Sequence, residues 1–86
     1  MKRGDKIYFA RILPKVEIYE VYDLKLRTVE ETWFSATDKK TGQAFLFHNK
    51  DIGNIVFFNR EEALEKVKNA ERDKKEINEE SYYEKF

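Results

Sequence analysis

The pattern of apolar and polar positions changes once along the chain, near Asn59. Before this residue, β-branched and aromatic residues dominate and often alternate with polar ones, which is typical of strands. After it, four apolar residues recur at helical spacing: Ala63, Leu64, Val67 and Ala70. The pattern predicts a β body over residues 1–58, an amphipathic helix over residues 59–76, and a charged, flexible tail over residues 77–86.

Two extended segments open the predicted β body. Residues Lys6 to Leu13 read as a strand with Ile7 and Phe9 on one side and Tyr8 and Ala10 on the other. The next segment, residues 16–29, is long and has apolar residues in both alternating phases. A strand of this kind is expected to contain a bend or a bulge.

A hairpin and a short last strand complete the β body. Residues 32–37 and 43–48 read as its two strands, and Gly42 lies where the turn needs a left-handed residue. Residues 50–54 are predicted to form a single turn and residues 55–58 a short strand. Asn59 is predicted to cap the helix, because its side-chain oxygen can accept a hydrogen bond from a first-turn amide.

Five short strands, a tight hairpin and a turn before the last strand resemble an SH3-like small barrel. The predicted fold class is therefore mainly β (α+β), an SH3-like antiparallel barrel or strongly bent sheet followed by one C-terminal helix. The alternative is an open antiparallel sheet with the helix packed across one face.

Composition limits the chemistry. The 86 residues include no cysteine and one histidine, and 17 basic residues balance 17 acidic ones. Disulfides and thiolate zinc sites are excluded, a cytoplasmic location is expected, and we expect no metal and no cofactor. No run of about 18 apolar residues is present, so we expect no membrane span. Zero formal charge disfavours nucleic-acid binding, which depends on neutralising phosphates.

Aromatic residues make up 15% of this polar sequence, more than a small core needs. The surplus is the main candidate for a binding face, since small barrels use aromatic grooves for peptides and stacking platforms for single strands. Lys25 and Arg27 share a strand phase with Tyr19, which suits either partner. The candidate binding residues are Tyr19, Tyr22, Lys25, Arg27 and Trp33.

Catalysis finds no support in the sequence. His48 lacks an evident nucleophile beside it, and the three glycines are too scattered for a phosphate-binding loop. Glu20 interrupts an apolar phase, so it either points inward or marks the bend. An enzyme would need a deep pocket that contains His48 or a buried Glu20, and we predict that the protein is not an enzyme.

Three segments carry a resemblance to a known group of proteins. They are residues 19–29 (YEVYDLKLRTV), residues 38–47 (DKKTGQAFLF) and residues 51–64 (DIGNIVFFNREEAL). Together they are similar to short uncharacterised proteins from prophages and mobile elements of Gram-positive bacteria. The resemblance spans most of residues 6–70 and implies a bacterial or phage origin and a cytoplasmic setting. It implies no activity and no functional residue.

Two hypotheses of function follow. The first is a non-catalytic module that binds a host or phage protein through an aromatic face of the barrel or through the C-terminal tail. The second is a nucleic-acid-binding accessory protein with a small barrel fold. It requires that six basic residues gather on one surface: Lys2, Arg3, Lys6, Arg11, Lys25 and Arg27.

Overall fold

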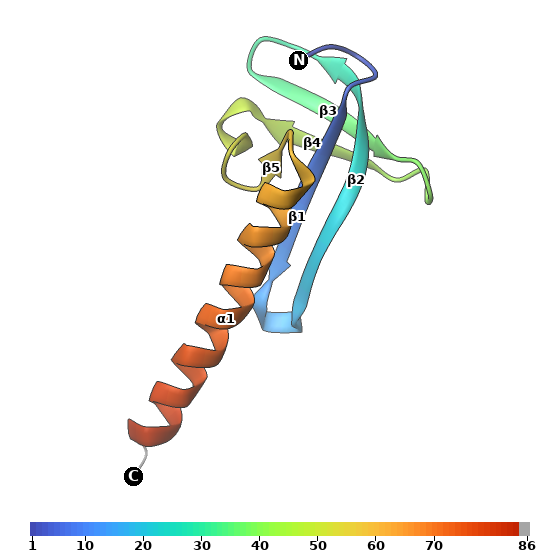
Figure 1. Ribbon diagram of the computed structural model, residues 1–86. Coiled ribbons are helices and arrows are strands. Elements are labelled where there is room, and N and C mark those ends of the chain that lie inside the picture. The colour runs from blue at the N-terminus through green and yellow to red at the C-terminus, as the bar shows by residue number, and fades with distance from the viewer. Residues whose placement is uncertain (85–86) are drawn as a thin grey trace.

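The computed structural model describes the backbone of residues 1–84 and the side chains of residues 1–73. Its strands are β1 (Lys6–Leu13), β2 (Ile18–Val29), β3 (Trp33–Asp38), β4 (Ala44–His48) and β5 (Val56–Phe57) (Figure 1). Two short 3₁₀ turns, η1 (Pro14–Val16) and η2 (Asn49–Asp51), precede β2 and β5, and the helix α1 is Arg60–Glu84. The predicted first strand, the hairpin and the turn before the last strand are all confirmed.

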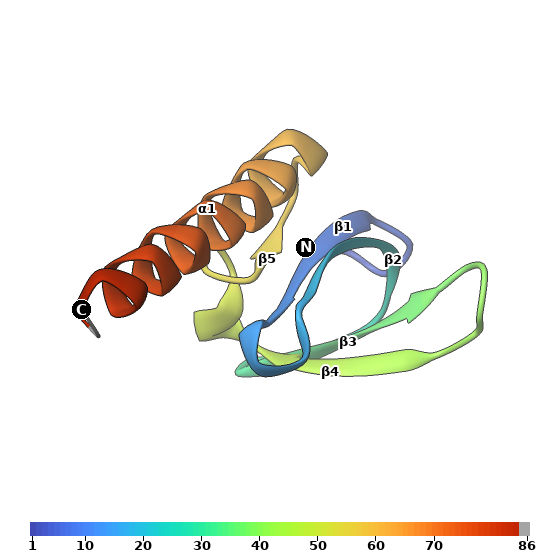
Figure 2. The same cartoon turned by 90° about the horizontal axis from the view of Figure 1, so that it is seen from below.

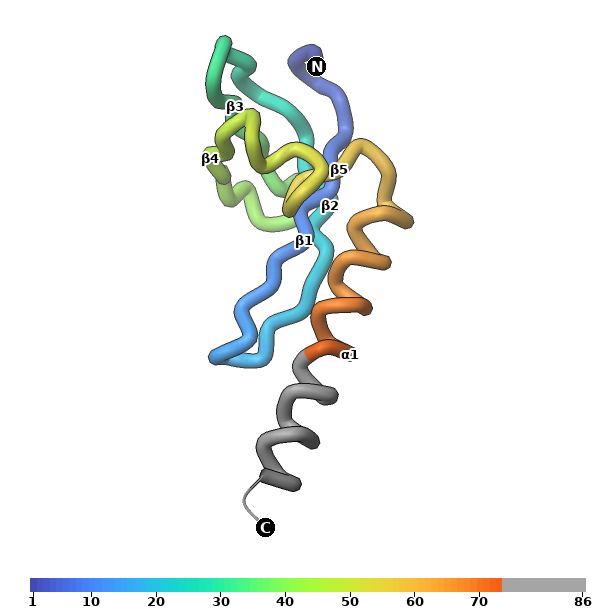
Figure 3. The backbone as a smooth tube through the Cα atoms, turned by 90° about the vertical axis from the view of Figure 1, so that its left-hand side faces the viewer, coloured from blue at the N-terminus to red at the C-terminus, as the bar shows by residue number. Residues whose placement is uncertain are grey.

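The strands form one antiparallel sheet in the order β4-β3-β2-β1-β5. The long strand β2 pairs with β1 over residues 18–25 and with β3 over residues 24–29. Because β2 changes partners along its length, the sheet curls into a half-barrel with the β1–β2 hairpin projecting from it (Figures 1 and 3). The predicted fold class is confirmed: a mainly β, SH3-like body followed by one C-terminal helix.

A bulge at Arg27 lets β2 serve both parts of the half-barrel. Leu26 is paired with Ala36, but Thr28 is paired with Ser35, so Arg27 is an extra residue in this strand. The insertion shifts the alternation by one position, and Val29 thereby packs against the same core as Leu26. The irregularity predicted within residues 16–29 is confirmed and lies near the end of the strand.

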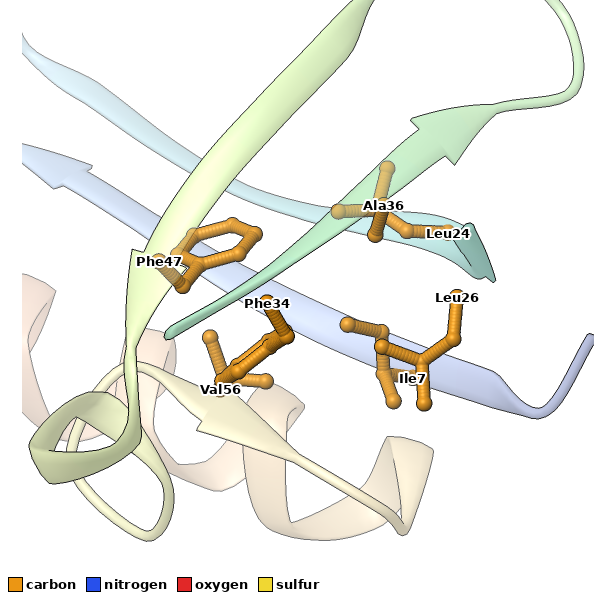
Figure 4. Close-up of a cluster of buried hydrophobic side chains, with 7 residues drawn as sticks. All are labelled: Ile7, Leu24, Leu26, Phe34, Ala36, Phe47 and Val56. Carbon is orange, nitrogen blue, oxygen red and sulfur yellow. The ribbon is translucent and has the colours of Figure 1, made fainter. Parts of the chain in front are cut away.

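The concave side of the half-barrel holds the larger core, which we call the inner core. Phe34 and Ile7 are its largest fully buried side chains, and every strand contributes to it (Figure 4). Its buried members are Ile7, Leu24, Leu26, Phe34, Ala36, Phe47 and Val56. Burial of these side chains is the main force that holds the five strands together.

A second core lies on the opposite face of the β1–β2 hairpin, beneath α1, and we call it the helix-side core. Figure 2 shows the hairpin between the helix on one side and β3–β4 on the other. Its buried residues are Ala10, Phe57, Ala63 and Val67, with Tyr8, Ile12, Tyr19 and Val21 packed against them. The helix therefore explains why β2 has apolar residues in both phases: Tyr19 and Val21 face α1.

Asn59 caps the helix as predicted, since its Oδ1 accepts a hydrogen bond from the Glu61 N–H at 2.8 Å. The helix continues to Glu84, beyond residue 76 where the sequence predicts its end. Segments rich in Glu, Lys and Arg have high helix propensity, which agrees with this longer extent. The predicted tail, residues 77–86, lies outside the part of the chain whose side chains are described, and its flexibility stays a prediction.

The β3–β4 turn has the predicted geometry. Gly42 has a φ of +75°, and its N–H donates to the Asp38 carbonyl at 2.9 Å. The Asp38 carboxylate also accepts from the Lys40 N–H at 2.8 Å, which closes the loop from within. A Cβ at position 42 would meet no other atom within 4 Å, so crowding does not exclude a side chain there. The positive φ is therefore the reason that glycine is favoured at this position.

Candidate functional site

Three half-buried rings lie together on the inner side of the half-barrel, and we call them the aromatic surface: Phe9, Tyr22 and Phe45. Phe9 on β1 is paired directly with Tyr22 on β2, so both rings leave the hairpin on the same face. Phe45 on β4 meets them from across the half-barrel, with its ring centre 5.5 Å from Phe9 and 5.9 Å from Tyr22. The rings are fixed by mutual contact while part of each remains accessible.

A polar network borders the aromatic surface. The Tyr22 hydroxyl donates to Glu20 Oε2 at 2.7 Å and accepts from Arg11 Nη1 at 3.0 Å. Arg11 and Glu20 are themselves cross-strand partners, so the phenol joins two opposite charges on one face. The Arg11 guanidinium also lies 5.7 Å from the centre of the Tyr22 ring. These bonds hold Tyr22 in one orientation.

Apolar side chains continue the same face toward the tip of the hairpin. Leu13 and Ile18 are the next cross-strand pair on this face after Arg11 and Glu20, and Leu13 is 40% exposed. Toward the hairpin tip, this face therefore carries an aromatic row (Phe9 and Tyr22), a charged row (Arg11 and Glu20) and an aliphatic row (Leu13 and Ile18). The helix packs against the other face of the hairpin (Figure 2).

The five binding residues proposed from the sequence lie in different places. Tyr19 packs against the helix-side core and Tyr22 belongs to the aromatic surface, on the opposite face of β2. Trp33 is half-buried and alternates with the buried Phe34, so it leaves β3 on the outer side. Lys25 and Arg27 are exposed near the other end of β2. The structure does not bring these five residues into one site.

Lys25 and Arg27 belong instead to a basic cluster on the outer side. With Arg3 they line one surface hollow, whose other lining residues are Gly4, Leu26 and Thr37. Lys6 is the direct cross-strand partner of Lys25, which brings a fourth positive charge to this place. Arg11 lies apart on the inner face with Glu20. Four of the six basic residues singled out in the sequence thus gather here.

The residues considered for catalysis are both accessible. His48 is exposed at the end of β4, and its backbone N–H donates to Asp51 Oδ2 at 3.0 Å. Glu20 is exposed and accepts the Tyr22 hydroxyl, so it marks no buried carboxylate. Within the described residues, no three His, Cys, Asp or Glu side chains gather as metal ligands do. Over the same part of the chain, no helix is both long and apolar enough to cross a membrane.

Sequence reasoning missed Phe9 and Phe45 as members of an accessible surface. Their alternation correctly assigns them to the same side as Ile7 and Phe47, which are buried. The pattern does not reveal that β4 ends the sheet and that Phe45 stays only half-buried, because both depend on how far the half-barrel closes.

No family model matches this sequence, and comparison with curated proteins and with solved structures found no similar protein.

Proposed function

We propose that this chain is a non-catalytic module that binds another protein through the aromatic surface. The observation that carries the proposal is the set of three rings in mutual contact, each half-buried, beside a hydrogen-bonded charged pair. Protein interfaces typically have an apolar, aromatic centre and a polar rim. Rings that are already fixed lose little conformational entropy when a partner covers them.

The arrangement favours a partner that offers an apolar side chain to the rings and hydrogen-bonding groups to the charged row. Phe9 and Phe45 supply the apolar contact, and Arg11 and Glu20 supply one donor and one acceptor of opposite charge. Leu13 and Ile18 extend the apolar contact toward the hairpin tip. The proposal includes a bacterial or phage origin and a cytoplasmic setting, supported by the resemblance and by the absence of cysteine.

The test begins with capture of a partner from the native host on the tagged full chain, followed by titration of the purified partner. Phe45→Ala is expected to weaken binding by ~30-fold, the effect of losing one interface hot spot of about 2 kcal/mol. Trp33→Ala is the control, because it removes a half-buried aromatic from the outer side of the sheet. Circular dichroism verifies that both variants fold. Equal affinity of wild type and Phe45→Ala for the partner would contradict the proposal.

A second candidate function, nucleic-acid binding, is supported by the basic cluster. Lys6 and Lys25 are directly opposite each other in the sheet, where like charges destabilise pairing. An anionic ligand in the adjacent hollow would relieve this repulsion. Asp5 lies in the same N-terminal turn, and its carboxylate accepts from the Lys2 N–H at 2.9 Å. The zero formal charge of the chain places this candidate second.

Titration of a labelled single strand and a labelled duplex separates the two candidates. Nucleic-acid binding predicts micromolar affinity that falls steeply between ~50 and ~200 mM salt, because each phosphate contact releases a counterion. The double variant Lys25→Glu, Arg27→Glu should abolish it. The matched control is Lys66→Glu, Lys68→Glu on the exposed side of the helix, which changes the net charge equally. An equal loss of nucleic-acid affinity in both double variants would show that the affinity depends on the net charge of the chain and not on the basic cluster.

A further inference from the structure

The strand β4 is one edge of the sheet and lacks the features that usually protect an edge. Its five residues, Ala-Phe-Leu-Phe-His, include no lysine, no carboxylate and no proline. Natural edge strands typically carry such residues, because an unpaired row of amides and carbonyls is a template for another chain. Leu46, at the centre of β4, is 63% exposed. The edge strand therefore has no neighbouring strand on one side, and the side chain at its centre is exposed.

The register with β3 shows which backbone groups point outward. Hydrogen bonds from the Asp38 N–H to the Gln43 carbonyl and from the Asn49 N–H to the Thr32 carbonyl mark bonded pairs at the two ends of the ladder. In an antiparallel ladder, bonded and non-bonded pairs alternate. Ala44, Leu46 and His48 therefore fall in non-bonded pairs, and their amides and carbonyls face away from β3.

One of these outward groups already has a partner. The His48 N–H donates to Asp51 Oδ2 at 3.0 Å. Among the described residues, β4 pairs with no strand other than β3. The amides and carbonyls of Ala44 and Leu46 thus remain on the free edge. The His48 carbonyl also points away from β3 and, as the N-cap carbonyl of η2, keeps one lone pair for a second donor.

We propose that β4 pairs with β4 of a second copy of this chain, antiparallel about a two-fold axis at Leu46. Leu46 then exchanges two hydrogen bonds with Leu46 of the partner subunit. The Ala44 N–H of each chain donates to the other chain's His48 carbonyl, which adds two more. These four bonds do not use the His48 N–H. That group already donates to the Asp51 carboxylate.

The charges at the two ends of β4 also favour a second copy in this orientation. The turn before β4 carries Lys39 and Lys40, both exposed. Beyond the other end of β4 lie the exposed Glu30 and Glu31, together with Asp51 and one cation, Lys50. The Glu31 carbonyl accepts a hydrogen bond from the Asn49 side chain, which holds this segment beside the end of β4. Antiparallel pairing places the basic end of each chain beside the acidic end of the other. Because β4 itself carries no charged group, its centre adds no repulsion.

The proposed contact is short. It joins five residues from each chain, fewer than the 20–30 residues that each side of a stable interface typically contributes. The dimer is therefore expected to be weak and to form only at high protein concentration. The contact is separate from the proposed protein-binding function, since it uses the backbone edge of β4 and not the rings, and either proposal can fail without the other.

Sedimentation equilibrium of the full chain over a concentration series tests the proposal. Leu46→Lys is expected to raise the dimer dissociation constant by at least ~10-fold, because it places two like charges side by side at the two-fold axis. Val16→Lys is the matched control, since Val16 is also 63% exposed but lies at the hairpin tip, and it should change the constant by less than ~2-fold. Equal effects of the two variants, or a strictly monomeric wild type at millimolar concentration, would overturn the proposal.

Amide hydrogen exchange supplies a test that needs no substitution. The amides of Ala44 and Leu46 should exchange fast in dilute protein and slow down as concentration rises. Those of Phe45 and Phe47 bond to β3 and should be protected at every concentration, which makes them internal controls. Protection of Ala44 and Leu46 that ignores concentration and appears only on addition of another protein would assign the edge to that protein and refute self-pairing.

Discussion

The inner core and the helix-side core lie on opposite faces of the same β1–β2 hairpin, yet they are built differently. The inner core has seven buried residues drawn from all five strands, and Phe34 and Phe47 are in ring contact within it. The helix-side core has four, of which Ala10 and Ala63 are the smallest possible apolar side chains. Six of the seven inner-core residues are larger than alanine, whereas two of the four helix-side residues are alanines, which let the helix approach the hairpin closely.

This difference implies a hierarchy of stability. Buried apolar area sets the free energy of each core, so the strands should remain together under conditions in which the helix has already left the hairpin. The helix in turn cannot form a core without the sheet, because its apolar stripe needs Ala10 and Phe57 to pack against. Four substitutions test this comparison, in order of decreasing expected effect.

Phe34→Ala should cause the largest loss, about 3–5 kcal/mol of unfolding free energy, because it opens a cavity in the middle of the inner core. Denaturant unfolding followed by Trp33 fluorescence measures it. If the variant does not fold, Phe34→Leu provides a smaller loss that can still be measured. A loss below about 1 kcal/mol for the alanine variant would show that the inner core does not dominate the stability.

Gly42→Val should destabilise the protein by about 1–3 kcal/mol through the β3–β4 hairpin. A β-branched residue is strained at a φ of +75°, although nothing crowds the added Cβ. The same denaturant series gives the value, and Gly42→Asn is the control because asparagine tolerates left-handed backbone. An unchanged midpoint for valine would mean that the turn readily adopts another conformation.

Val67→Ala should cost roughly 1.5 kcal/mol, because it removes two buried methyl groups from the helix-side core. Hydrogen exchange distinguishes the two cores here. The first turns of α1 should exchange about tenfold faster, while the amides that join β3 to β4 should change less. A uniform change over both regions would contradict the hierarchy and indicate that helix and sheet unfold as one unit.

Asn59→Ala should cost about 1 kcal/mol by removing the hydrogen bond to the Glu61 N–H, and Asn59→Asp should be nearly neutral. This smallest effect should again be confined to the helix. Backbone chemical shifts of residues 60–63 report whether the first turn frays. No loss in the alanine variant would mean that the tertiary contacts of Ala63 alone hold the start of the helix.

The sequence predicts the local elements well, because each depends on neighbours in the chain. The boundaries of β1 match the predicted strand, and Gly42 and Asn59 have the predicted roles because turns and caps are decided within a few residues. The sequence shows the two apolar phases of β2, but on its own it predicts only a bend or a bulge as their cause. The bulge is real, yet it lies at Arg27, whereas Tyr19 and Val21 are apolar because the helix covers them.

The candidate surface is harder to predict, because it depends on elements that are distant in the chain. The sequence places Tyr22 and Tyr19 in one candidate set, although they are in opposite phases of β2 and pack against different cores. Alternation shows that two residues of one strand lie on opposite faces. It does not show which face a distant element will cover. Phe45 joins Tyr22 only through the curl of the sheet, a property of all five strands together.

A hairpin that is apolar on both faces also alters what fixes the register of its strands. In most sheets, a slip by one residue exposes the apolar set to water and is strongly disfavoured. In this hairpin a slip of β1 would exchange Ile7 and Phe9 with Tyr8 and Ala10, and both faces would stay apolar. Side-chain volume therefore takes part in selecting the correct register, since a ring in place of Ala10 would push α1 away. Ala10, the smallest side chain of β1, therefore contributes to the alignment of the longest hairpin, beside the Arg11–Glu20 pair on the other face.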